Sequence, residues 1–137
     1  MRPQRRRPDD PVEWLNRARS NLIRAKSDAR LEGVCFEDLC FDAQQASEKA
    51  IKGVLIQLGV VFPYVHDLGA LIALIERAGL SVPEGVREAA RLTRFALVTR
   101  YPGLAERVTK AEYDRAVAVS EAVVRWAEEQ VPGGQGP

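Results

Sequence analysis

The stretch that decides the fold is FEDLCFDAQQASEKAIKGVLIQL, residues 36–58. Its apolar positions recur every three or four residues, which is the period of one face of an α-helix. The acidic pair Glu37-Asp38 suits the positive end of a helix dipole, and Gly59 is the expected C-cap. The apolar stripe has small residues in its middle, which would let another helix approach closely: Phe36, Leu39 or Cys40, Ala43, Ala46, Ala50, Val54 and Leu58.

Four further segments have a helical period, over about residues 10–32, 66–78, 83–98 and 109–131. Asp10 before Pro11 is an N-cap signal, and Thr109-Lys110-Ala111-Glu112 fits the capping-box pattern. The apolar segment 60–64 contains a proline, so we expect a buried connector there and no strand.

Short connections between periodic helices favour antiparallel neighbours. The sequence therefore predicts an all-α fold, an up-and-down bundle of four long helices plus one short helix. We expect a single domain over residues 10–131, between a flexible basic arm at 1–9 and a flexible Gly- and Pro-rich tail at 132–137.

The composition excludes several classes of protein. The 137 residues include 20 Lys+Arg and 19 Asp+Glu, so the net charge of +1 does not favour bulk polyanion binding. No apolar run is long enough to cross a membrane, and none follows the N-terminal arginines as in a signal peptide. We therefore expect a cytoplasmic protein without membrane association.

Few residues are available for metal or cofactor chemistry. His66 is the only histidine, and Cys35 and Cys40 are five positions apart with no further ligand nearby. We expect no disulfide, no metal and no cofactor, and both cysteines are expected to be small buried or half-buried groups. No glycine-rich phosphate loop is present either.

An arginine stripe is the strongest candidate for a binding surface. Steps of four and three along the helix expected at 83–98 align Arg87, Arg91, Arg94, Val98 and Tyr101, with Arg100 just off the line. One interpretation is a solvated face with Glu84 and Glu88 as partners within the helix. The other is a surface that binds phosphate oxygens through guanidinium groups and stacks a base on the tyrosine.

Several other polar residues allow both a structural and a functional interpretation. Asp38 and Asp42 are four apart and could act as an acid–base pair or form an exposed acidic ridge. The pair Glu48 and Lys52 has the spacing of an ordinary ion pair on a helix. His66-Asp67 could be a catalytic dyad, but a cap at a helix start, with His66 against the connector, is the favoured interpretation. Trp14 and Trp126 are expected to be core anchors.

Three segments together resemble a known family. Residues 41–52, FDAQQASEKAIK, resemble the second-helix signature of HEPN domains of bacteria and archaea, and His66-Asp67-Leu68 and Thr99-Arg100-Tyr101-Pro102-Gly103 resemble the next two landmarks. The resemblance covers roughly residues 11–131. It implies a helical bundle that usually forms homodimers, often encoded beside a minimal nucleotidyltransferase with which it acts as a toxin–antitoxin or nucleotide-handling pair.

Catalytic members of this family are metal-independent ribonucleases with an R-x4-6-H motif, which one branch extends to R-x4-H-x-Y. Arg94 and Tyr101 match this pattern, but Thr99 stands where the histidine belongs. A threonine hydroxyl cannot act as a base near neutral pH, and loss of a positioned base typically costs about 10²–10⁴-fold in rate. By the resemblance, Arg94 is the candidate catalytic residue if the chain is a ribonuclease.

Three functional hypotheses follow. The leading one is a protein that binds a nucleotide or RNA through Arg87, Arg91, Arg94, Arg100 and Tyr101 and works with a nucleotidyltransferase partner, without strong nuclease activity of its own. By the branch resemblance, Tyr101 is also a candidate acceptor of a nucleotidyl group. The second is a metal-independent endoribonuclease with an unorthodox base, such as His66 supplied across a dimer. The third is a purely structural dimerisation or adaptor module.

Overall fold

The computed structural model describes residues 9–27, 32–97 and 107–135. Within these ranges the chain forms six α-helices and one 3-10 helix: α1 (Pro11–Ala25), α2 (Phe36–Gln57), α3 (Leu68–Arg77), α4 (Glu84–Arg87), η2 (Glu88–Leu92), α5 (Arg94–Leu97) and α6 (Lys110–Gln130). The described residues contain no strand, so the predicted all-α bundle is confirmed. No helix in these ranges is both long and apolar enough to cross a membrane.

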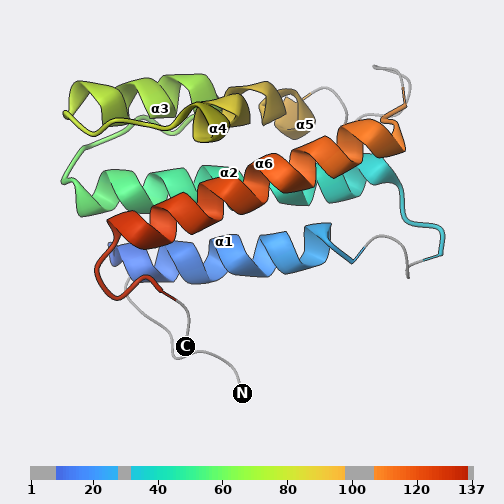
Figure 1. The fold of residues 1–137 in the computed structure, drawn as a ribbon, viewed down its shortest axis with the longest axis horizontal. Helices are drawn as coiled ribbons and strands as arrows, with labels where there is room; N and C mark the ends of the chain where they lie inside the picture. Colours follow the sequence, from blue (N-terminus) through green and yellow to red (C-terminus); the bar gives the residue numbers. More distant parts are fainter. Residues whose placement is uncertain (1–8, 28–31, 98–106, 136–137) are drawn as a thin grey trace.

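The helix α2 forms the centre of the bundle. It packs against α1 on one side and against α3, η2 and α5 on the other, and α6 crosses it (Figure 1). Because neighbours surround α2, its small residues are fully buried, including Ala43, Ala46 and Ala50. The helix also buries polar side chains, which an ordinary amphipathic helix would leave in water.

A glycine allows α1 and α2 to approach closely. A Cβ atom added at Gly53 would lie 3.3 Å from both the Pro11 carbonyl oxygen and the Trp14 Cβ atom. At the start of α1, Asp10 caps the helix by accepting a hydrogen bond from the Val12 amide at 2.9 Å. Trp14 is half-buried at this contact, and Trp126 of α6 is buried in the core.

The predicted start signals of α3 and α6 are confirmed. Asp67 caps α3 by accepting from the Ala70 amide at 3.2 Å. At α6 the Thr109 hydroxyl accepts from the Glu112 amide at 3.1 Å, and the Glu112 carboxylate accepts from the Thr109 amide at 3.1 Å. Both halves of the capping box are therefore present.

The segment expected to form one helix over residues 83–98 is instead broken. It consists of α4, η2 and α5, and the break after η2 lies at Thr93. The Thr93 hydroxyl accepts a hydrogen bond from the Leu68 amide at 3.1 Å, which ties this point to the first turn of α3. A side chain that bonds outside its own helix competes with regular helical geometry, and a 3-10 turn accommodates the distortion. The last expected residue, Val98, lies outside the described residues.

Two smaller expectations need correction. In the connector between α2 and α3, Val60 and Phe62 pack against the core, but Val61 and Tyr64 are each 93% exposed, so the connector is only half-buried. Cys40 is buried as expected, whereas Cys35 is exposed because it precedes α2 as its N-cap residue. Both cysteines are free.

The chain after α6 turns back onto the bundle. The Arg19 guanidinium of α1 donates to the Gly134 carbonyl, and the Gln135 side chain donates to the Glu128 carbonyl at 2.9 Å. Gly134 and Gln135 of the expected tail are therefore in contact with α1 and α6. Of the expected N-terminal arm, residues 1–8 lie outside the described residues.

Candidate functional site

A row of buried polar side chains lies on α2, on the side that faces α3. Gln44, Glu48 and Lys52 follow one another at intervals of four residues and are only 0%, 4% and 4% exposed. Charged side chains are almost never this deeply buried unless they are paired. The Glu48–Lys52 pair, expected from its spacing to be an ordinary ion pair on a helix, is therefore an internal feature of the bundle.

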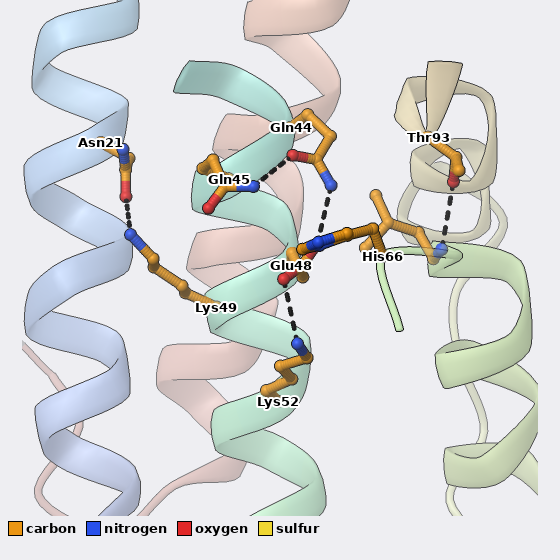
Figure 2. A network of polar contacts seen from close by, with 9 residues as sticks. Asn21, Gln44, Gln45, Glu48, Lys49, Lys52, His66 and Thr93 are labelled. Carbon is orange, nitrogen blue, oxygen red and sulfur yellow. Dashed lines mark hydrogen bonds and ion pairs between the residues drawn. The ribbon is translucent and has the colours of Figure 1, made fainter. Parts of the chain in front are cut away.

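The Glu48 carboxylate accepts three hydrogen bonds. Its Oε1 atom accepts from Gln44 Nε2 at 2.9 Å and lies 2.9 Å from His66 Nδ1, and its Oε2 atom lies 3.0 Å from Lys52 Nζ (Figure 2). Burial would raise the pKa of Glu48, but the hydrogen bonds from His66, Lys52 and Gln44 outweigh it and hold the pKa below its ordinary value. This carboxylate is therefore ionised at neutral pH in spite of its burial.

His66 reaches this carboxylate from the connector between α2 and α3. Figure 2 shows its ring directed at Glu48, between α2 and the turn that carries Thr93. Its neighbour Asp67 makes a different contact, the cap of α3. The structural interpretation of Asp67 as a cap is thus confirmed, and the partner of His66 is Glu48 instead of Asp67.

Aromatic rings of the connector cover the end of this row. The Lys52 ammonium lies 5.7 Å from the centre of the Phe62 ring and 5.5 Å from that of Tyr64. The Tyr64 ring also stands edge-on to His66, with the ring centres 6.1 Å apart. The half-exposed imidazole of His66 and the exposed phenol of Tyr64 therefore lie at the surface next to the buried ammonium of Lys52.

A second polar network lies on the opposite side of α2, against α1. Asn21 donates to Asp42 at 3.1 Å and accepts from Lys49 at 2.7 Å. Burial is the largest cause that lowers the pKa of Lys49. Asp42 is only 6% exposed whereas Asp38 is exposed, so these two carboxylates do not form the exposed acidic ridge considered from their spacing.

The arginine face, defined here as Arg87, Arg91 and Arg94, remains open to solvent. The three side chains are 51%, 78% and 46% exposed, respectively. They are carried by α4, η2 and α5 in turn, so the break in this segment replaces the regular stripe expected from a single helix.

Each guanidinium of the arginine face pairs with a carboxylate. The expected pairs of Arg87 with Glu84 and of Arg91 with Glu88 are present at 3.7 and 3.3 Å. Three pairs that join different elements were not expected from the sequence: Arg87 with Glu76 of α3 at 2.7 Å, Arg94 with Glu112 of α6, and Arg115 of α6 with Glu88 at 3.5 Å. Only the fold could bring these residues together.

The third segment of the family resemblance lies outside the residues that the structure describes. It consists of Thr99, Arg100, Tyr101, Pro102 and Gly103. Arg94, from the same stretch of chain, stacks over the Phe95 ring at 4.3 Å from its centre. Within the described ranges, no three His, Cys, Asp or Glu side chains gather as metal ligands do.

The family follows from the comparison with known domains. A family model described as the HEPN domain matches residues 12–130, nearly all of the described fold. The chain belongs to the HEPN family. Within this HEPN domain, two of the three signature segments meet in space, because Glu48 of the first is hydrogen-bonded to His66 of the second.

Solved structures share the fold. TT1696 from Thermus thermophilus is 30% identical, with a TM-score of 0.74 over 90% of this chain and 99% of that one. ST0689, an archaeal HEPN homologue, is 23% identical, with a TM-score of 0.66 over 88% of this chain and 96% of that one. No curated protein matches the chain.

Proposed function

We propose that this HEPN-domain protein binds a nucleotide or RNA through its arginine face and acts, as a homodimer, with a minimal nucleotidyltransferase in a toxin–antitoxin-like pair. The observation that carries the proposal is the exposure of Arg87, Arg91 and Arg94, whose side chains remain about half exposed or more on one short segment. A guanidinium can bind two phosphate oxygens at once, so three of them between positions 87 and 94 can follow a phosphate backbone.

The ion pairs on this face do not oppose ligand binding. The glutamates Glu76, Glu84, Glu88 and Glu112 are 35%, 83%, 23% and 42% exposed, and ion pairs that solvent can reach contribute only about 0–1 kcal/mol each. A phosphate oxygen can therefore replace or join the carboxylate at small cost. The glutamates would keep the arginines extended and ordered while no ligand is bound.

Binding is tested with a fluorescein-labelled single-stranded RNA of mixed sequence by fluorescence anisotropy. The triple variant Arg87→Gln, Arg91→Gln, Arg94→Gln is expected to weaken binding by about tenfold or more, because charge-assisted contacts are lost. The slope of log K against log salt should also become shallower, by about 0.7 for each lost phosphate contact.

The control for this experiment is Arg17→Gln on α1. Arg17 is also exposed, at 61%, and also pairs with a glutamate, Glu13, at 3.1 Å, but it lies on a different helix. The control should bind RNA as the wild type does. Equal affinity of the triple variant and the wild type would contradict the proposal and favour the purely structural adaptor module.

Association with a nucleotidyltransferase makes a separate prediction. After co-expression with a cognate minimal nucleotidyltransferase, the chain should copurify with it and carry a nucleotidyl group on Tyr101. Mass spectrometry of the digested protein would detect the mass of the adduct on the peptide that contains Tyr101, and Tyr101→Phe should abolish it. An unmodified Tyr101 in the copurified complex would refute the acceptor role and leave the partnership standing.

A further inference from the structure

Lys49 differs from the other lysines of the chain in the group that holds its amine. All four lysines of the chain lie within the described residues. Three of them pair with a carboxylate, at 3.7 Å for Lys26, 3.0 Å for Lys52 and 2.9 Å for Lys110. The Nζ atom of Lys49 instead donates to a neutral amide oxygen, Asn21 Oδ1, at 2.7 Å. Among the described residues, Lys49 therefore has no carboxylate in direct contact with its ammonium.

The amide of Asn21 is held in one orientation by a second contact. Its Nδ2 atom donates to Asp42 Oδ1 at 3.1 Å, which leaves the amide oxygen for Lys49. Asn21 and Asp42 are only 7% and 6% exposed, and Figure 2 shows the Lys49 side chain reaching from α2 to Asn21 on α1. An uncharged acceptor orients the amine but stabilises its protonated form less than a carboxylate does.

Burial and nearby charges disfavour the protonated form of Lys49. The side chain is half-buried, and burial is the largest cause that lowers its pKa below the ordinary value. The positive charges of Arg17 and Arg24 act in the same direction. The carboxylates of Glu48 and Asp42 oppose them without cancelling the shift. More of this amine is therefore neutral at a given pH, and only the neutral amine is a nucleophile.

Two exposed guanidinium groups lie beside this amine. Arg17 and Arg24 are four positions before and three after Asn21 on α1, so they share its face of the helix. Their side chains are 61% and 70% exposed. Arg24 Nε lies 3.6 Å from Oδ2 of Asp42, the same carboxylate that holds Asn21. Because a guanidinium can bind two phosphate oxygens at once, this surface favours small reagents that carry a phosphate.

We propose that the Nζ atom of Lys49 is an acceptor site for acylation by small acyl phosphates, with Asn21 as its positioning residue and Arg24 as the contact for the phosphate. This inference is independent of the arginine face and of RNA binding. Lys52, three positions further along α2, is excluded as the acceptor because its side chain is only 5% exposed and is paired with Glu48.

The reaction needs no partner besides the acyl phosphate. The lone pair of Lys49 Nζ attacks the carbonyl carbon and forms the nitrogen–carbon bond. The bond from that carbon to the phosphate oxygen breaks, and inorganic phosphate leaves with the electron pair. One proton of the amine passes to solvent. The product is a neutral acyl-lysine, whose remaining N–H can still donate to Asn21.

Acetyl phosphate is the probe for this reaction. The full chain is incubated with it at neutral pH and then denatured, and the remaining amines are capped with deuterated acetic anhydride. Tandem mass spectrometry then gives the extent of acetylation at each lysine. We expect Lys49 to react about three- to tenfold faster than Lys26 and Lys110, although these are 50% and 68% exposed. Acetylation of Lys49 that is no faster than theirs would overturn the proposal.

The role of Asn21 is tested by Asn21→Asp. This change places a carboxylate against the ammonium, which favours the protonated form, and should slow acetylation of Lys49 by about tenfold. The rates at Lys26 and Lys110 in the same sample are the internal controls, and circular dichroism checks the fold. An unchanged rate at Lys49 in the folded variant would overturn the positioning role.

A measurement on the unaltered chain tests the same point without a substitution in the core. With rising pH, the acetylation rate at Lys49 in the native protein should level off below the ordinary lysine pKa of 10.5. In the chain unfolded by urea it should level off at that ordinary value. The same profile in both states would show that the fold does not activate Lys49 and would overturn the proposal.

A neutral acetyl donor, phenyl acetate, separates recognition of the phosphate from reactivity of the amine. Arg24→Gln should slow acetylation of Lys49 by acetyl phosphate about threefold or more and change the reaction with phenyl acetate much less. The control is Arg115→Gln on α6, which is similarly exposed at 65% and should alter neither rate. An unchanged rate in Arg24→Gln, or equal slowing with both donors, would overturn the role of Arg24.

Discussion

Lys52→Met is expected to destabilise the domain by about 3–5 kcal/mol, because it leaves the buried carboxylate of Glu48 without its cation. Methionine has a similar length, so the change removes charge with little change in packing volume. The Glu48 and Lys52 side chains are only 6% and 5% exposed, so water cannot replace the lost ammonium. Urea unfolding followed by circular dichroism measures the difference in the free energy of unfolding.

The matched control is Lys110→Met on α6. Lys110 and Asp114 have the same spacing of four residues and a similar distance, 2.9 Å, but their side chains are 68% and 56% exposed. The control should change the free energy of unfolding by no more than about 0.5 kcal/mol. A second substitution, Glu48→Gln, in the Lys52→Met background should recover part of the loss, because no buried charge is then left unpaired. Similar effects of Lys52→Met and Lys110→Met would contradict the internal role of the pair.

The pH dependence of stability follows from the same carboxylate. The pKa of Glu48 in the folded protein is held below its ordinary value of 4.5, so the folded state binds its proton less tightly than the unfolded state does. Its contribution is therefore complete above that ordinary value and is lost as the pH falls through the folded pKa. In Lys52→Met the carboxylate should take up a proton at higher pH, and the difference from the wild type should shrink in acid.

Gly53→Val is expected to destabilise the domain by about 3 kcal/mol by forcing α1 away from α2. Even a single Cβ at this position would lie 3.3 Å from the carbonyl oxygen of Pro11, which belongs to the backbone and cannot rotate away. Two further methyl groups would reach Trp14 and the start of α1. Thermal unfolding measures the effect as a fall in Tm.

The same substitution at Gly85 is the control. Gly85 lies in α4, and nothing lies within 4 Å of a Cβ added there. Replacing a helical glycine in open space removes backbone entropy from the unfolded chain, so Gly85→Val should be neutral or stabilising by about 0.5 kcal/mol. Equal losses at both positions would show that helix propensity, and not the close approach, decides the effect.

Local signals predicted the fold well because they act within one turn of a helix. Asp10, Asp67 and Thr109 each cap the helix that the sequence assigned to them. The prediction of one helix over residues 83–98 was wrong because a contact distant in sequence decides the structure there. The helical period of these residues is genuine, but the hydrogen bond from Leu68 to Thr93 crosses 25 positions of sequence and is visible only in the folded chain.

In the candidate site, too, contacts between elements far apart in the sequence could not be predicted from local patterns. The glutamate–lysine spacing on α2 predicts an ion pair, but whether the pair is exposed depends on which helices cover it. Polar residues scattered among a stripe of alanines were the available signal, because a helix without a continuous polar face is surrounded by other elements. The partners Glu76 and Glu112 of the arginine face had no such signal, since they lie on other helices.

The labelling rates of the two cysteines can report how often the central helix α2 separates from its neighbours. Cys35 is exposed at the start of α2, so a thiol reagent can modify it directly in the native protein. Cys40, little more than one turn further on, is buried, and burial raises the pKa of its thiol to about 12. Only the thiolate reacts, so Cys40 should be labelled no faster than α2 separates from its neighbours. The labelling rate of Cys40 would therefore measure the rate at which the bundle's central helix becomes exposed, without any engineered probe.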